Sequence, residues 1–323
     1  MVQEQAQDKL KEKLKDFSVR LVLTAHPTQF YPGEVLGIIN DLSKALIDEN
    51  TSQVNMYLQQ LGKTPCFKKE KPSPYDEAIS LVWFLENIFY QSAGRIVSFI
   101  RAQFPGSLGR DNSVIRMGFW PGGDRDGNPF VKEPTTLEVA AALRASIMKC
   151  YFREVRNLRR RLTFKRVDNV VAALEAKLSR NLFVAGHKAD ISRDEILDTL
   201  AGIRETIMTE HNGLFVHLVD NLISKVEIFG LFFASLDIRQ DSSVHEAVLE
   251  AVAAGTPALP DNYASLTDNE KVHALLNIKE VIDPKVLENP LHQDCLQTIK
   301  TIRQIQATNG EQGCNRYIIS HST

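Results

Sequence analysis

Four short apolar runs, separated by long stretches of helical pattern, most limit what this 323-residue chain can fold into. The first, Leu21-Val22-Leu23-Thr24, should end at about Ala25, because Pro27 has no N–H for a strand ladder. The others cover residues 114–120, 229–238 and 316–320. No Asn-Gly type of hairpin turn links two runs directly, and each connection is long enough for helices, which predicts parallel strands.

Each run leads into polar residues at its carboxyl end. These are His26, the pair Asp124 and Arg125, then Arg239, and finally Ser320 with His321. Parallel strands place such residues on one side of the sheet, as in a (β/α) barrel, whose closed form has eight strands. The sequence thus predicts a single α/β domain over residues 1–323, predominantly helical. It would be an incomplete (β/α) barrel of about four parallel strands with many crossover helices, and a fragment of a longer protein.

Helical periodicity fills most of the chain between the runs. Thr135 with Glu138, and Ser192 with Glu195, have the spacing of capping boxes that open two of these helices. The stretch 50–75 is polar and contains three prolines, which predicts a surface connection at least in part. The other expected helices cover residues 3–17, 34–48, 75–104, 167–180, 213–227, 267–280 and 293–307.

Composition excludes several classes of function. The 38 basic and 40 acidic residues nearly balance, whereas a nucleic-acid or membrane-surface partner usually requires a basic excess. A basic run near residues 153–161 is interpreted as a solvated helix face. The four cysteines form no CxxC pair, which favours reduced thiols in the cytoplasm. The charged amino terminus is no signal peptide, and no apolar run is long enough to span a bilayer.

Three motifs, in this order, resemble the phosphoenolpyruvate carboxylase family. They are Thr24-Ala25-His26-Pro27-Thr28, Gly122-Gly123-Asp124-Arg125-Asp126-Gly127-Asn128-Pro129 and Leu236-Asp237-Ile238-Arg239-Gln240-Asp241. Tyr317-Ile318-Ile319-Ser320 also resembles a strand of that family. The eight-residue motif is the most specific, and the resemblance extends from about residue 20 to the end of the chain.

The resemblance implies a carboxylase that makes oxaloacetate and phosphate from phosphoenolpyruvate and bicarbonate, and so replenishes the tricarboxylic acid cycle. His26 matches the family histidine that helps carboxyphosphate release CO₂ beside the enolate, a role that suits an imidazole near neutrality. Arg239 matches the arginine that binds the substrate phosphate, and Trp120 matches a tryptophan of the bicarbonate pocket. The family uses Mg²⁺ or Mn²⁺; its ligands are expected beyond the end of this chain, with none in it. A homotetramer is the form that the family implies.

Other interpretations of these residues stay open. Arg239 could pair with Asp237 or Asp241 instead of a phosphate. Asp124, Arg125 and Asp126 are expected to organise their loop, because charged side chains in a tight turn usually satisfy one another.

Departures from the family pattern bear on activity. Gln29 stands where the family usually has glutamate, and the family's later motifs are absent, so this chain alone is predicted to be inactive. His245 and His321 are interpreted as structural. A non-enzymatic half-barrel that serves as a binding or assembly module is the alternative.

Overall fold

A four-stranded, all-parallel sheet lies at the centre of the computed structural model, which describes residues 2–24, 33–66, 72–110, 112, 114–126, 128–184, 186, 191–279 and 281–322. The strands are β1 (Val19–Leu23), β2 (Ile115–Phe119), β3 (Ser235–Asp241) and β4 (Arg316–Ser320), in spatial order β1-β2-β3-β4. All three pairings are parallel. The predictions of parallel strands and of a mainly helical α/β fold are confirmed, and the sheet is compatible with an incomplete barrel.

The two faces of the sheet differ in chemistry because side chains alternate along a strand. Ile115, Met117 and Phe119 of β2 belong to the main hydrophobic core, together with Leu236 and Ile238 of β3. The intervening residues form the opposite, polar face, and pairing across the sheet brings Arg20 of β1 beside Arg116 of β2. We call this second face the inner face, since it corresponds to the interior of a barrel.

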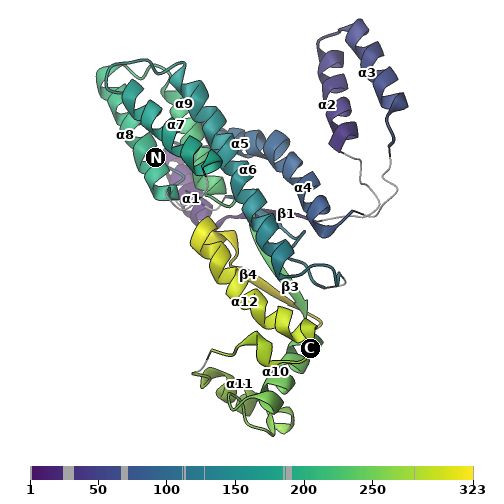
Figure 1. Cartoon of the computed structure of the whole chain (residues 1–323). Coiled ribbons are helices and arrows are strands. Elements are labelled where there is room, and N and C mark those ends of the chain that lie inside the picture. Colours follow the sequence, from purple (N-terminus) through teal and green to yellow (C-terminus); the bar gives the residue numbers. More distant parts are fainter. Residues whose placement is uncertain are drawn as a thin grey trace.

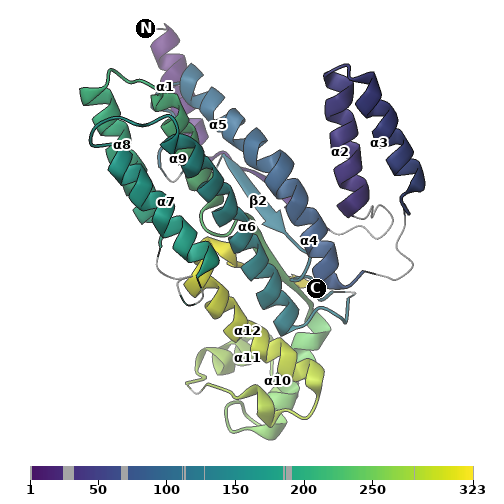
Figure 2. The same ribbon diagram turned by 45° about the horizontal axis from the view of Figure 1, so that its top comes forward.

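Helices cover the apolar face of the sheet. Figures 1 and 2 show α5, α6 and α9 running alongside the sheet, with α7 and α8 packed beyond them. The main core joins these helices to the strands. The helices of this part are α1 (Val2–Asp16), α4 (Pro74–Phe84), α5 (Tyr90–Gln103), α6 (Glu133–Arg159), α7 (Asp168–Phe183), α8 (Arg193–Glu210) and α9 (Val216–Phe229).

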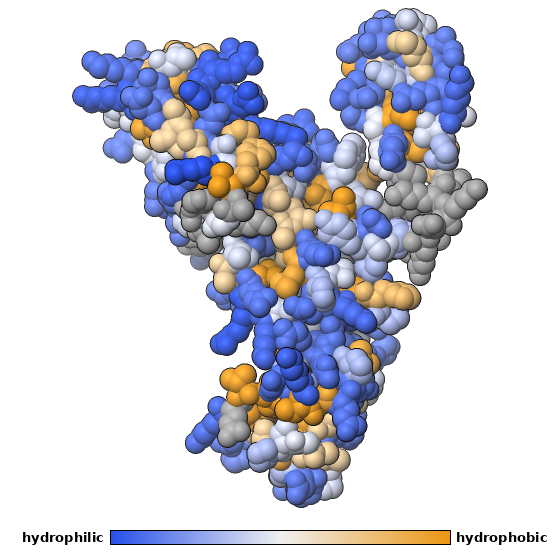
Figure 3. Space-filling view, viewed as in Figure 1, coloured by the Kyte–Doolittle hydropathy of each residue, from blue (hydrophilic) through white to orange (hydrophobic). Residues whose placement is uncertain are grey.

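Two further parts extend from this body. A smaller core, including Val252, Leu259 and Cys295, holds together α10 (Ser242–Gly255), α11 (Asp268–Leu276) and one side of α12 (Pro290–Asn309). The second part is a hairpin of α2 (Gly33–Ile47) and α3 (Thr51–Lys63), which projects away from the body as a separate arm (Figures 1 and 3).

The strand expected over residues 229–238 is placed wrongly at its start. Phe229 is the last residue of α9, and the chain then turns through Gly230 and Phe233, which have φ values of 50° and 62°. β3 begins only at Ser235 and continues to Asp241. The aromatic residues before it are apolar because they are buried in the core, and a short apolar run has the same composition in a buried turn as in a strand.

The helices also correct several predictions. Residues 51–63, expected within a polar connection, form α3, whose first turn is capped by the side chain of Asn50. The helix expected over 75–104 is interrupted by a π-helical turn at Leu85–Phe89. Thr135 does not cap a helix, because α6 already begins at Glu133, with Pro134 in its first turn. The Ser192 cap is confirmed, since its hydroxyl accepts from the Glu195 N–H at 3.1 Å.

Candidate active site at the carboxyl ends of the strands

The carboxyl ends of β2, β3 and β4 bring most of the predicted site residues to one edge of the sheet. Trp120 follows β2 directly, Arg239 lies near the end of β3, and His321 follows β4. His26 lies outside the described residues, although β1, which leads toward it, ends at this same edge.

A glycine turn after β2 approaches the backbone of β3 closely. The N–H groups of Gly123 and Asp124 both donate to the Trp120 carbonyl at 2.9 Å, which folds the chain back on itself. A Cβ at Gly123 would lie only 2.1 Å from the Asp237 carbonyl oxygen, so only glycine fits there. The turn then bonds to β3 through Arg239 N–H to the Gly123 carbonyl and Arg125 N–H to the Arg239 carbonyl, both at 3.0 Å.

This close approach places Arg239 among the side chains of the loop. Its Nη1 donates to Asp124 at 2.8 Å and its Nη2 to Asp126 at 2.9 Å. The guanidinium lies over the Trp120 ring, 4.3 Å from its centroid. Two of its five N–H groups hold the carboxylates, which leaves three for another acceptor. Asp124, Asp126 and Trp120 therefore hold the Arg239 guanidinium in a fixed and partly exposed position at the rim.

Arg239 does form ion pairs, the alternative to a phosphate-binding role, but its partners are Asp124 and Asp126 and not Asp237 or Asp241. Asp237 is fully buried and instead accepts from Arg20 at 2.5 Å and from the Trp120 indole at 3.1 Å. Asp241 bonds to Ser243 and His321. Side chains alternate along β3, so Asp237 and Arg239 share the inner face but are directed to different neighbours.

Asp124 has an unusual affinity for a proton. Burial raises the pKa of its carboxyl group, while Arg239 and the Asp126 N–H pull the pKa down less strongly. The carboxylate beside Arg239 is thus easier to protonate than an exposed one.

Arg125 faces away from the rim and fastens the loop to the rest of the fold. Its side chain is 4% exposed. Nε donates to Asp294 of α12 at 3.1 Å, Nη1 to the Gly123 carbonyl at 3.3 Å and Nη2 to the Thr136 hydroxyl at 3.0 Å. Asp294 also accepts the Glu133 N–H at 2.8 Å, at the start of α6. These contacts join the loop to α6 and α12.

Sequence reasoning missed a contact between the ends of β3 and β4. The Nδ1 of His321 lies 2.6 Å from the Asp241 carboxylate, whose pKa is lowered first by the Ser243 hydroxyl and further by His321. Parallel pairing sets Asp241 opposite Ser320, the neighbour of His321, but this register is known only from the structure.

Asp126, Asp241 and His321 each offer one possible metal ligand, and the three atoms lie within 4.8 Å of one another. Mg²⁺ requires oxygen ligands and retains several waters. Here Asp126 already accepts from Arg239, Asp241 accepts from Ser243, and the third donor is an imidazole nitrogen. These residues therefore do not fit a magnesium site.

The other predicted structural histidine, His245, lies in α10 and contacts the ring of Tyr317. Its imidazole is half-buried, and burial lowers its pKa. None of the helices in the described ranges is both long and apolar enough to cross a membrane.

The four-stranded parallel sheet, with Arg239 and Trp120 at the carboxyl ends of its strands, places the chain in the α/β class and is compatible with an incomplete (β/α) barrel. The family model for phosphoenolpyruvate carboxylase matches residues 1–190 and 184–323, and the chain belongs to this family. It is 26% identical to the phosphoenolpyruvate carboxylase of Gloeobacter violaceus, over 96% of this chain and 40% of that protein. The chain thus spans about two fifths of the length of this curated relative.

Proposed function

We propose that this chain supplies one part of the active site of a phosphoenolpyruvate carboxylase, with Arg239, Trp120 and His26 as the residues that meet the substrates. The observation that supports this most directly is the geometry of Arg239. Two carboxylates and an indole ring hold its guanidinium at the carboxyl edge of the sheet while three of its N–H groups remain.

The proposed reaction uses phosphoenolpyruvate and bicarbonate. A bicarbonate oxygen attacks phosphorus, and the bond from phosphorus to the enol oxygen breaks, which gives carboxyphosphate and the enolate of pyruvate. His26 takes the carboxyphosphate proton, carboxyphosphate splits into CO₂ and phosphate, and the proton returns to phosphate. The enolate carbon then attacks CO₂, and the new C–C bond completes oxaloacetate. The proton that bicarbonate brings therefore leaves on phosphate, and no redox partner is needed.

Arg239 and Trp120 have different tasks in this scheme. The guanidinium binds phosphate oxygens with its remaining N–H groups, a geometry for which arginine is well suited. Asp124 and Asp126 leave the cluster with a net negative charge when both are ionised, so protonation of Asp124, whose pKa burial raises, favours binding of an anion. The apolar surface of Trp120 keeps water from the enolate, which would otherwise be protonated to pyruvate.

The proposal extends to the whole protein. The 323 residues would form one domain, the amino-terminal half of the barrel, in a homotetrameric enzyme that requires a divalent metal ion. Its thiols are free, namely half-buried Cys66 and buried Cys150, Cys295 and Cys314, which suits the reducing cytoplasm.

Binding of phosphoenolpyruvate to this chain tests the role of Arg239 without requiring a complete active site. We expect Arg239→Gln to weaken binding by about 10- to 100-fold in calorimetry. This factor corresponds to the loss of about 1.5–3 kcal/mol, the contribution of a hydrogen bond to a charged group. Arg156→Gln, which removes an exposed arginine of α6, is the matched control and should bind like the wild type. Equal affinity in the Arg239→Gln and control variants would refute the assignment.

A coupled assay of oxaloacetate formation tests the extent of the site. The chain alone, given Mg²⁺, phosphoenolpyruvate and bicarbonate, should show no turnover above the blank. In a longer protein that contains this chain, His26→Asn should abolish oxaloacetate formation while the circular dichroism spectrum is unchanged. Turnover by the chain alone would contradict the incomplete site, and full activity of His26→Asn would contradict the role of the histidine.

A further inference from the structure

The loop that holds Arg239 is itself held from the outer side of the sheet. Residues 123–126 run beside the end of β3, with a parallel bridge between Asp124 and Arg239. Side chains alternate along such a segment, so Asp124 and Asp126 reach Arg239 while Arg125 is directed to the opposite side. One short segment therefore presents the candidate phosphate-binding cation on its inner side and Arg125 on its outer side.

A single carboxylate on α12 fixes Arg125 on that outer side. Asp294 accepts the Arg125 Nε–H at 3.1 Å with Oδ2 and the Glu133 N–H at 2.8 Å with Oδ1. The side chains of Arg125 and Asp294 are 4% and 16% exposed, so little water reaches this pair. Asp294 therefore joins α12 to the loop and to the start of α6 through both of its carboxylate oxygens.

Arg125 connects Asp294 to Arg239 through the backbone of the loop. Its Nη1 donates to the Gly123 carbonyl at 3.3 Å, and the same oxygen accepts the Arg239 N–H at 3.0 Å. The Arg125 N–H donates in turn to the Arg239 carbonyl at 3.0 Å. Both backbone groups of Arg239 are thus bonded to a loop that Asp294 holds in place. A shift of this loop also moves the two carboxylates that orient the guanidinium.

We propose that Asp294 is a positioning residue for the candidate active site. Through Arg125 it sets where the loop holds the Arg239 guanidinium over Trp120, and therefore how well Arg239 meets the substrate phosphate. This inference rests on the proposed function, because it takes Arg239 to bind phosphoenolpyruvate. Asp294 itself touches no substrate. The position matters because bonds from a guanidinium to a phosphate group depend on a fixed, paired geometry.

The fluorescence of Trp120 tests the positioning without any ligand. The chain has two tryptophans, so a Trp83→Phe background leaves Trp120 as the only reporter. The Arg239 guanidinium covers the Trp120 ring at 4.3 Å from its centroid. In Asp294→Asn, displacement of the guanidinium should uncover the ring, which raises the rate constant for quenching by acrylamide and shifts the emission maximum to longer wavelength. Emission and quenching that match the parent chain would overturn the proposal.

Glu154→Gln in the same background is the matched control. Glu154 of α6 pairs with Lys225, whose side chain is 1% exposed, so this variant also deprives a buried cation of its carboxylate. It lies roughly 30 Å along α6 from Glu133, where the helix meets the loop. Urea denaturation establishes that both variants are folded under the conditions of measurement. The Trp120 signal should be unchanged in the control, and an equal shift in both variants would show general loosening of the fold and refute the positioning role.

Calorimetric titration with phosphoenolpyruvate tests the consequence for binding. Asp294→Asn should weaken binding by about 3- to 10-fold, roughly the square root of the factor expected for Arg239→Gln, because the guanidinium is displaced but still present. In the double variant, Asp294→Asn should cause no further loss, since the residue that it positions is gone. Losses that multiply in the double variant would show that Asp294 acts independently of Arg239 and would overturn the inference.

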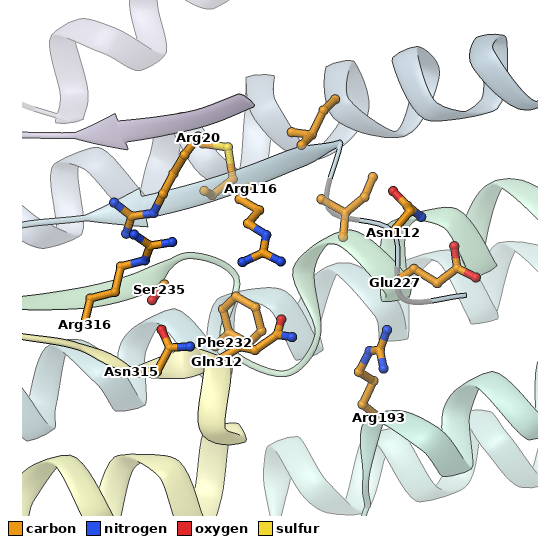
Figure 4. A pocket seen from close by; sticks show the side chains of 13 residues that line it. Arg20, Asn112, Arg116, Arg193, Glu227, Phe232, Ser235, Gln312, Asn315 and Arg316 are labelled. Carbon is orange, nitrogen blue, oxygen red and sulfur yellow. The ribbon is translucent and has the colours of Figure 1, made fainter. Parts of the chain in front are cut away.

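The double variant also separates the rim from other arginines of the chain. Arg20, Arg116 and Arg316 lie together at the amino ends of their strands (Figure 4), where they can also contact a phosphate monoester. Ligand held there does not depend on Arg239, so the interaction between the two substitutions reports on the rim alone.

The two proposals fail in different ways. If Arg239→Gln binds phosphoenolpyruvate like the wild type, the proposed function is refuted, and the emission of Trp120 still decides whether Asp294 positions the guanidinium. If Arg239→Gln weakens binding while Asp294→Asn does not, the role of Asp294 alone is refuted.

Discussion

The contact between Gly123 and β3 predicts a large effect from a single added methyl group. In Gly123→Ala the new Cβ would lie 2.1 Å from the Asp237 carbonyl oxygen, whereas real contacts of this kind stay above 3.0 Å. The loop must therefore retreat by about 1 Å from β3. This movement stretches the two backbone hydrogen bonds, both of 3.0 Å, that join the loop to Arg239.

The magnitude follows from these two costs. Overpacking costs about 1–3 kcal/mol, and two weakened backbone hydrogen bonds cost about 1 kcal/mol each. We expect Gly123→Ala to lower the free energy of unfolding by about 3–5 kcal/mol, measured by urea denaturation and circular dichroism. Gly202→Ala in α8 is the matched control, because no heavy atom lies within 4 Å of its Cβ position. It should stabilise the protein by about 0.5–1 kcal/mol, since alanine favours a helix. A Gly123→Ala midpoint equal to that of the wild type would refute the close packing of this loop on β3.

Two further changes test the contacts around the rim. Asp294→Ala should destabilise the protein by about 3–5 kcal/mol in urea denaturation, because it leaves the buried Arg125 guanidinium without its carboxylate; a loss below 1 kcal/mol would show that this pair is not needed. Ser243→Ala should raise the pKa of Asp241, measured by carboxyl-carbon NMR, because the Ser243 hydroxyl is the main cause of its lowered value. A carboxyl group whose pKa is lowered in the folded state adds stability at pH values above its unfolded pKa. This added stability is lost as the pH falls through the folded pKa. The wild type should therefore exceed Ser243→Ala in stability at neutral pH, with the difference vanishing in acid, and an unchanged Asp241 pKa would contradict this.

The sequence predicted the parallel sheet because its strands are short, apolar and bounded by residues that end a strand. The run 316–320 was located correctly for this reason. The helix that begins after Ser192 was located from its capping residue. The start of β3 could not be found in the same way. Phe232 and Phe233 are buried by the turn that follows α9, and burial alone makes a run apolar.

The sequence identified residues that lie together at the candidate site, but it did not identify most of the contacts between them. Arg239, Trp120 and the aspartates of the glycine loop were all identified, and the structure brings them together. The partner of Arg125 could not have been identified, because Asp294 lies far along the chain on α12 and its proximity depends on packing between helices.

The order of the strands also determines when each can pair during synthesis. Val19 pairs with Ile115, so β1 is translated and then waits while roughly a hundred more residues are added. At translation rates of about 5–20 residues per second, that delay lasts about 5–20 s. Each later strand joins the preceding one in the same sequence, because β3 pairs with β2 and β4 with β3. The nascent chain thus carries β1 as an unpaired apolar strand while about a third of the 323 residues is made, and during that time β1 is accessible to a chaperone at the ribosome.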